Sequence, residues 1–208
     1  MKTAIISVPM MKPEKVKRFN YSADGNKEIE YDKEIMCPVH AVLAKTLKKN
    51  EELKVIYILT TGRNSSFKEN VTNFKAELEE INSDIGADIH YETIEIEFKP
   101  TKATLQKILT ELAAKIPNNA EIYADITFGY KPAIISLFCA IKFAEEFREA
   151  LIQYIVYGKV EFLDEKDNKG EPVLFDISSL YYLFNLMGSM RTADADAATK
   201  MLEDFFSI

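Results

Sequence analysis

The stretch EIYADITFGYKPAIISLFCAI, residues 121–141, decides the fold class, because a strand-like run passes directly into a helix-like run. The first half is rich in β-branched and aromatic residues. The second half is a long apolar run that begins just after Pro132, a residue suited to the first turn of a helix. The link between them holds an acid, a hydroxyl, a glycine and a lysine. Such a link is either a capped turn or part of a ligand site.

The same order of strand and helix recurs along the chain. Strand-like runs occur at 3–8, 54–60, 89–98, 121–128 and 151–158. Segments with helical periodicity lie between them, at 38–49, 66–81, 101–116 and 133–147. The start of the second of these is marked by Ser66 and Glu69, which form a Ser-x-x-Glu capping box. This alternation predicts an α/β, Rossmann-like fold with a mainly parallel sheet of about six strands and helices on both faces.

Three segments depart from this alternation. Residues 17–31 contain Asp-Gly-Asn between two strand-like pieces and predict a hairpin inserted after the first strand. Residues 158–177 predict a second hairpin with a polar tip at the sheet edge. Residues 178–208 have a helical pattern rich in aromatic residues and methionine. They either pack on the chain's own sheet or contact a second subunit or a further domain.

Composition and charge limit the function. The chain is 47% hydrophobic and 28% charged, as in globular proteins, and a formal net charge of -7 argues against general nucleic-acid binding. Cys37 and Cys139 lack metal-type spacing, so we predict two buried thiols and no metal or cofactor. No apolar run is long enough to span a membrane and no signal pattern is present, which predicts a cytoplasmic protein.

In a parallel α/β sheet, ligands bind beyond the carboxyl ends of the strands, so three loops are candidates for the site. The predicted ligand-binding residues are Pro9, Met10, Met11, Thr60, Thr61, Gly62, Arg63, Asn64, Ser65, Thr127, Phe128, Gly129, Tyr130 and Lys131. In the second loop, donors, a glycine, an arginine and a following helix N-terminus suit an anion. Asp125, inside an apolar strand, is predicted to accept hydrogen bonds from a neighbouring loop, with Thr127 on the same strand face. Both loops are also compatible with simple capping.

The run Asp125-Ile126-Thr127-Phe128-Gly129-Tyr130-Lys131 resembles the signature of the CARF family, the CRISPR-associated Rossmann-fold sensors of type III immunity. That signature reads Asp-x-[Thr/Ser]-His-Gly-[aromatic or basic]. The polar loop after the second strand, the early NY and EY pairs and the closing LFDISSLYYLFNLM are also similar to the family, so the resemblance covers residues 1–190. Phe128 stands where many members have His, and its ring could stack on a base.

The resemblance implies that the chain binds a cyclic oligoadenylate, a ring of four or six AMP units, in a homodimer whose two copies share one pocket. It implies allosteric control of an effector domain in antiviral defence. Neither His40 nor His90 has the arginine of a HEPN ribonuclease nearby, so we expect the effector to lie outside this sequence. Residues 191–208 are then either a helical tail or the start of a linker.

Two other functions stay open. The first is a metal-independent ring nuclease that opens the same ligand, for which we assign no catalytic residue. The second is a generic nucleotide-binding domain, which the missing Gly-x-Gly-x-x-Gly fingerprint makes less favourable. DNA binding is not expected, because no basic recognition helix is present in the sequence.

Overall fold

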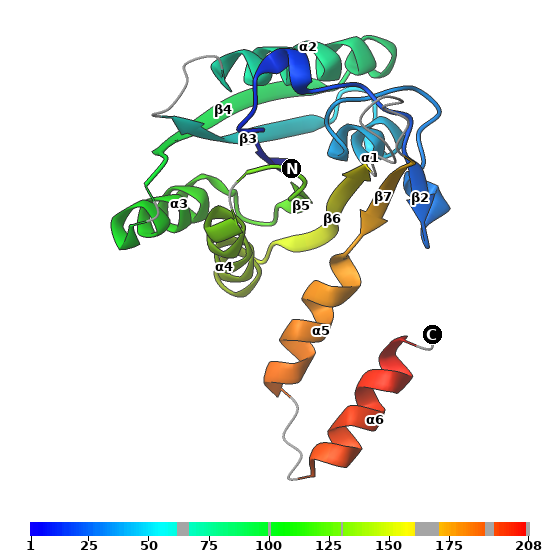
Figure 1. The fold of residues 1–208 in the computed structure, drawn as a ribbon, viewed down its shortest axis with the longest axis vertical. Helices are drawn as coiled ribbons and strands as arrows, with labels where there is room; N and C mark the ends of the chain where they lie inside the picture. Colours follow the sequence, from blue (N-terminus) through cyan, green and yellow to red (C-terminus); the bar gives the residue numbers. More distant parts are fainter. Residues whose placement is uncertain (62–66, 100, 130, 161–170, 190–193, 207–208) are drawn as a thin grey trace. The chain divides into compact units, whose positions relative to one another are not determined.

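The computed structural model describes residues 1–61, 67–99, 101–129, 131–160, 171–189 and 194–206. Within these residues the chain forms an α/β fold with one seven-stranded sheet in the order β2-β7-β6-β5-β1-β3-β4 (Figure 1). The strands are β1 (Lys2–Ser7), β2 (Ser22–Asp24), β3 (Glu52–Thr61), β4 (Asp88–Glu97), β5 (Glu121–Asp125), β6 (Leu151–Val160) and β7 (Pro172–Asp176). Among the pairs of strands that the structure describes, only β6–β7 is antiparallel. The predicted Rossmann-like, mainly parallel sheet is confirmed.

Helices cover both faces of the sheet, with α2 on one side and α3 and α4 on the other (Figure 1). The helices are α1 (Val39–Thr46), α2 (Phe67–Ile85), α3 (Lys102–Lys115), α4 (Lys131–Arg148), α5 (Ser178–Ser189) and α6 (Ala195–Phe206), with short 3-10 turns η1 (Pro13–Lys15) and η2 (Lys27–Ile29). The four predicted helices inside the sheet domain are therefore present. Their ends move by a few residues, as expected where helices fray or tighten.

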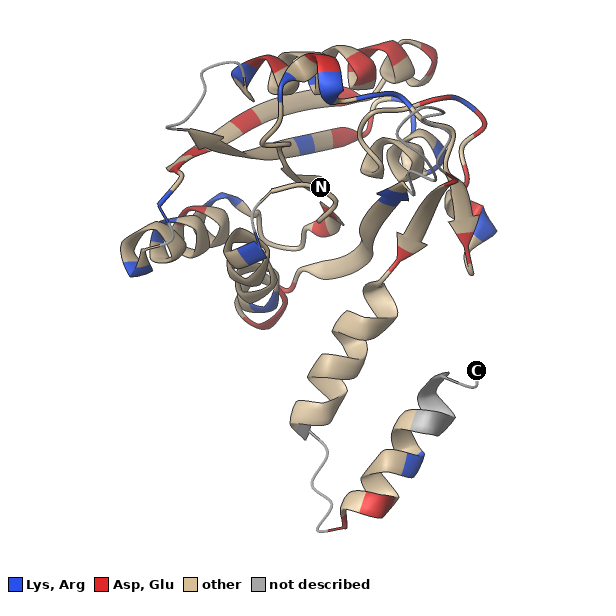
Figure 2. Ribbon diagram, in the orientation of Figure 1, with Lys and Arg blue, Asp and Glu red and all other residues tan. Residues whose placement is uncertain are grey.

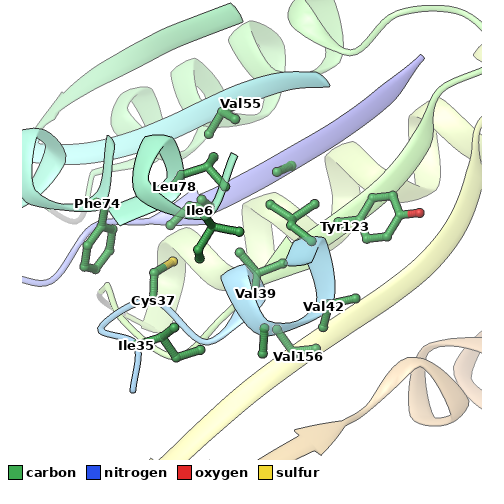
Figure 3. Packing of buried hydrophobic residues seen from close by; sticks show 14 of the residues in the cluster. Ile6, Ile35, Cys37, Val39, Val42, Val55, Phe74, Leu78, Tyr123 and Val156 are labelled. Carbon is green, nitrogen blue, oxygen red and sulfur yellow. The ribbon is translucent and has the colours of Figure 1, made fainter. Parts of the chain in front are cut away.

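The two layers of the core follow from alternation along the central strand. Ala4 and Ile6 of β1 lie in the cluster that also contains Phe74 and Leu78 of α2, whereas Ile5 points to the opposite face. Figure 3 shows this first layer, in which residues of α1 and α2 meet residues of β1, β3, β5 and β6 around Ile6 and Cys37. Because β1 is buried along its whole length, both layers are anchored on it.

The predicted hairpin over 17–31, a range that the structure describes in full, is wrong. Only one strand forms there, β2, and it pairs in parallel with β7 far along the chain. Asp24-Gly25-Asn26 does form a turn, because Gly25 has φ +79° and the Asn26 side chain accepts a hydrogen bond from the Glu28 N–H at 3.1 Å. That turn leads into η2 rather than into a second strand, so the segment becomes the edge of the sheet.

The second predicted hairpin is confirmed in its strands: β6 and β7 pair antiparallel from Val156–Asp176 to Val160–Pro172. Its polar tip, 161–170, lies outside the described residues. The fourth core strand is shorter than predicted. β5 ends at Asp125 instead of reaching residue 128, since Gly129 has φ +94° and the chain turns away before it.

By its internal contacts the chain divides into two compact units, Met1–Asp176 and Ile177–Ile208. The second unit contains α5 and α6, and α5 carries no Lys, Arg, Asp or Glu (Figure 2). The predicted functional division at residue 190 stays a prediction. Among the described residues, no helix is both long and apolar enough to cross a membrane.

Candidate functional site

The order of the strands places the candidate site. From β1 the chain crosses over towards β3 and β4 on one side, whereas β5 and β6 lie on the other side. The loops that leave the carboxyl ends of β1 and β5 therefore diverge to opposite faces of the sheet, and open α/β sheets bind ligands in the crevice at such a point. Two of the three predicted loops, 9–11 and 127–131, flank this crevice.

The loop after β5 lies close to the end of β1. Gly129 has φ +94°, and a Cβ added to it would lie 3.0 Å from Cβ of Ser7, the last residue of β1. The Ser7 hydroxyl is buried and has no hydrogen-bond partner among the residues that the structure describes. Glycine is therefore required both for the turn and for the close approach of this loop to β1.

Asp125 organises the loop after β5, as the sequence predicted. Its side chain is fully buried, and its Oδ2 accepts a hydrogen bond from the Val39 N–H at 2.9 Å, at the start of α1. Its Oδ1 accepts one from the Thr127 N–H at 2.9 Å. Burial raises the pKa of Asp125, although the bonds from Thr127 and Val39 oppose this rise. The carboxyl group thus fixes the positions of two neighbouring loops at once.

Thr127 lies beyond the end of β5, so its predicted place on the same strand face as Asp125 is wrong. Its hydroxyl oxygen accepts a hydrogen bond from the Gly158 N–H of β6 at 2.8 Å, and the hydroxyl also bonds the Asp125 carboxyl group. This hydroxyl is therefore engaged in holding the loop against β6. We infer that Thr127 positions the site rather than contacting a ligand through its side chain.

The loop after β1 is held by α2. Asn70, fully buried on α2, donates hydrogen bonds to the carbonyl groups of Pro9 and Met11 at 3.1 and 2.9 Å. Pro9 is buried, Met10 is half-buried and Met11 is exposed. Of the three predicted residues in this loop, only Met11 has a freely accessible side chain.

The second predicted loop is only partly described. Thr60 and Thr61 are the last two residues of β3, and the Thr61 hydroxyl donates to the Ile96 carbonyl at 3.1 Å. Thr60 is buried. Gly62, Arg63, Asn64, Ser65 and Tyr130 lie outside the described residues. Lys131 is exposed and is the first residue of α4.

A second buried carboxylate, Glu77 of α2, was not anticipated as part of the site. It accepts hydrogen bonds from the N–H groups of Met36 and Cys37 at 2.7 and 3.1 Å, and it lies 2.7 Å from Nδ1 of His40. Arg18 also forms an ion pair with this carboxylate, with 3.7 Å between Arg18 Nε and Glu77 Oε2. His40 is fully buried on α1 and packs edge-on against Phe74 of α2.

The two cysteines differ from each other. Cys37 is buried with its Sγ 3.6 Å from Asp125 Oδ2, and burial, together with the nearby Asp125 charge, raises the pKa of this thiol well above its ordinary value. An elevated pKa keeps the thiol protonated and unreactive. Cys139, predicted to be buried, is exposed on α4, so that prediction is wrong. It lies on a face of α4 that does not contact the sheet.

A groove of about 690 Å³ opens beside the loop after β5. It is lined by Met11, Glu14, Lys15, Val16, Lys17, Phe19, Tyr21, Thr127, Phe128, Gly158 and Val160. Phe128 is half-buried and packs on Phe74, with ring centroids 6.1 Å apart. A volume of this size suits a small organic ligand, and its aromatic walls suit a flat ring.

The groove residues Glu14, Lys15, Val16, Lys17, Phe19 and Tyr21 were missed by sequence reasoning. They lie in an irregular segment without periodicity, and the only available signal was the alternation of Phe19 and Tyr21 with polar residues. The groove closes because Gly158 lets the chain pass Tyr21: a Cβ at residue 158 would lie 3.1 Å from the tyrosine ring and 2.4 Å from Pro38. The packing of Gly158 against Tyr21 and Pro38 joins residues far apart in the sequence, so no local pattern predicts it.

Among the residues that the structure describes, no group of three His, Cys, Asp or Glu side chains is placed to hold a metal ion. Comparison of the chain with protein-family models gave no match, and a search of curated proteins also gave none. The site offers an aromatic groove, lysines at its rim and a glycine loop at a helix N-terminus, a set suited to binding an anion that carries flat rings.

Proposed function

We propose that this chain is a sensor that binds a cyclic oligoadenylate at the crevice between the loops after β1 and β5. The observation that carries the proposal is the contact of Gly129 with Ser7 at the reversal of strand order. The loop that carries the CARF-like signature lies at the place where α/β sheets bind nucleotides. Ligand binding would then control the activity of an effector domain in the cytoplasm during antiviral defence.

The chemistry of the groove supports this ligand class. The Phe128 ring offers an aromatic surface on which a base can stack, and stacking of this kind is worth about 1–3 kcal/mol per base. Lys15 and Lys17 line the same groove, and Lys131 begins α4, the helix that follows the loop after β5. These cations supply local positive charge for phosphates although the whole chain is acidic.

Titration calorimetry with cyclic tetra-adenylate and cyclic hexa-adenylate tests the proposal. We expect one of the rings to bind, and Lys131→Ala to weaken binding by about 10-fold or more, as expected for loss of a charge-assisted bond. The matched control is Lys102→Ala. Lys102 is also exposed and also begins a helix, α3, but that helix follows β4 at the far edge of the sheet.

Absence of heat with both rings, or equal weakening by the two lysine variants, would overturn the assignment of the site. Chromatography of the ligand after long incubation addresses the alternative function. An intact ring agrees with a sensor, whereas a linear product would show that the protein is a ring nuclease.

A further inference from the structure

One side of the groove is formed by an irregular segment, residues 14–21, which we call the strap. Apart from the end of the short turn η1, the strap forms neither helix nor strand, although the structure describes all of its residues. The remaining lining of the groove comes from the end of β6 and from the loops after β1 and β5. The shape of the groove therefore depends on the contacts that hold the strap in place, because a segment of this kind lacks the backbone hydrogen bonds of regular structure.

The side chains of the strap alternate in direction. Lys17 and Phe19 line the groove, whereas Arg18 between them extends to α2. Arg18 Nη2 lies 3.0 Å from Glu80 Oε2, and Arg18 Nε lies 3.7 Å from Glu77 Oε2. The Glu77 side chain is 1% exposed and that of Glu80 is 68% exposed. One arginine thus joins the strap to a buried and to an exposed carboxylate of the same helix.

A second segment, residues 35–39, connects the strap with the rest of the groove, and we call it the brace. Phe19 of the strap and Ile35 of the brace exchange two backbone hydrogen bonds of 2.9 Å. Glu77 accepts hydrogen bonds from two other N–H groups of the brace, and Asp125 accepts one from a third. The brace therefore links the strap both to α2 and to the loop after β5. Glu77 bonds the brace and Arg18 at the same time.

We propose that Arg18 is a positioning residue of the ligand groove. Its ion pairs with Glu77 and Glu80 hold the strap against α2 and so fix Lys17 and Phe19 in the lining of the groove. Arg18 is not among the residues that line the groove in the described structure, so it acts through its two neighbours in the chain. The identity of the ligand rests on the proposed function, whereas the placement of the strap does not.

The burial of Glu77 makes this contact more than a surface ion pair. An ion pair between two exposed side chains contributes little, because water and salt screen it. Arg18 also faces a carboxylate that is shielded from water, where charges interact more strongly. When the strap leaves its place, the groove loses part of its lining, and the apparent Kd rises by the inverse of the fraction of chains that keep the strap in place.

Titration calorimetry with cyclic tetra-adenylate and cyclic hexa-adenylate measures the effect on binding. We expect Arg18→Ala to weaken binding about 5-fold or more, as the fraction of complete grooves falls. Arg18→Lys should recover part of the affinity, because an ammonium group can pair with one carboxylate but lacks the fork of donors of arginine. Thermal unfolding should change little in both variants, because the Arg18 side chain is 41% exposed. Wild-type affinity in Arg18→Ala would overturn the proposal.

The direction of the Glu80→Gln effect separates positioning from the charge of Arg18 itself. If charge alone acted, removal of a negative charge would leave binding of an anion unchanged or make it tighter. Positioning predicts weaker binding, because Arg18 loses its nearest partner, and the double variant with Arg18→Ala should bind no more weakly than Arg18→Ala alone. Asp84→Asn is the matched control. It removes the same charge from α2, one turn further on, where Asp84 is exposed and faces Lys33 at 3.9 Å.

Equal or tighter binding in Glu80→Gln would overturn the positioning role. So would equal weakening by Glu80→Gln and Asp84→Asn, because the second substitution does not touch the contacts of the strap.

Methyl NMR without ligand follows the strap directly. Val16 belongs to the strap and lines the groove, and Val55, fully buried in β3, is the internal reference. Glu80→Gln should shift and broaden the Val16 methyl resonances and leave those of Val55 unchanged, because exchange between two positions of the strap broadens its signals. Asp84→Asn should leave both unchanged. Wild-type Val16 resonances in Glu80→Gln would overturn the proposal.

The two measurements separate this inference from the proposed function. A wild-type chain that binds neither ring, but whose Val16 resonances respond to Glu80→Gln alone, loses the sensor function and keeps Arg18 as the residue that positions the groove. A chain that binds a ring with an affinity that Arg18→Ala and Glu80→Gln leave unchanged keeps the sensor function and loses the positioning role.

Discussion

At the scale of single residues, Asp125 shows how one side chain joins sequence-distant parts of the site. It contacts the N-terminus of α1 through Val39 and its own loop through Thr127. Each of its oxygens accepts a backbone N–H, and both are fully buried. A buried acceptor of this kind stabilises the fold only as long as every donor that faces it is satisfied.

We expect Asp125→Asn to lower the free energy of unfolding by about 1–3 kcal/mol, because the amide nitrogen would face a backbone donor. Urea denaturation at neutral pH measures this loss. Asp84→Asn is the matched control, since Asp84 is exposed on α2 and should cost little. Equal effects of the two substitutions would mean that the Asp125 contacts contribute no more than a surface charge.

Gly129 makes a second prediction at this scale. Gly129→Ala adds the strain of φ +94° and a contact of 3.0 Å with Ser7, whereas Gly25→Ala adds strain at φ +79° with nothing within 4 Å. We expect Gly25→Ala to cost about 1–2 kcal/mol and Gly129→Ala clearly more. Chemical denaturation of both variants isolates the cost of the contact. Identical losses would indicate that the loop after β5 is not packed against the end of β1.

At the scale of elements, the helices and central strands were predictable because their signals are local. The four-and-three spacing from Phe67 to Ile81 defines α2, and its inward residues Phe74 and Leu78 are fully buried. β2 was not predictable as a partner of β7. It is three residues long, and its pairing joins Ser22 to Val173, so nothing near either residue marks it.

The candidate site also contains residues that the sequence predicted and residues that it did not. The loop with Asp125 and Gly129 was found because a buried acid and a glycine stand out in an apolar run. The groove residues between Glu14 and Tyr21 were missed, because the groove forms where Gly158 lets the chain pass close to Tyr21. The Thr127 hydroxyl was assigned to the ligand, because its hydrogen bond with the distant Gly158 N–H leaves no mark in the nearby sequence. Sequence patterns place elements, whereas the use of each polar group depends on what the folded chain brings next to it.

An ion-pair network between elements gives a prediction for pH. Glu92 of β4 is bonded by Lys115 of α3 and by Lys54 of β3, the latter at 2.7 Å. The bonds from Lys115 and then Lys54 lower the pKa of Glu92 in the folded chain. A lowered folded pKa contributes stability that is present above the ordinary pKa of about 4.3 and is lost as pH falls through the folded value.

We therefore expect Glu92→Gln to destabilise the chain at neutral pH, and the difference from wild type to shrink as pH falls from roughly 5 to 3. Urea denaturation across this range measures it. Glu97→Gln is the control, since Glu97 pairs with Lys99 in an exposed position. A difference that stays constant down to the lowest pH would assign the effect of Glu92→Gln to packing rather than to charge.

At the scale of the whole molecule, charge acts in two opposite ways. The formal net charge of -7 makes two copies repel each other, while the lysines that line the groove, Lys15 and Lys17, attract an anion locally. Figure 2 shows that α2, α3 and α4 carry residues of both signs. The acidic total therefore does not exclude an anionic ligand, because screening limits each interaction to about 10 Å at moderate salt.

Salt should weaken binding of the proposed ligand. When NaCl rises from roughly 0.05 M to 0.3 M, screening weakens the attraction between the lysines and the phosphates, so we expect cyclic oligoadenylate affinity to fall several-fold. Calorimetry at several salt concentrations measures this response. An affinity that stays constant over the range would contradict binding of the phosphates by the lysines, since screening weakens every attraction between exposed opposite charges.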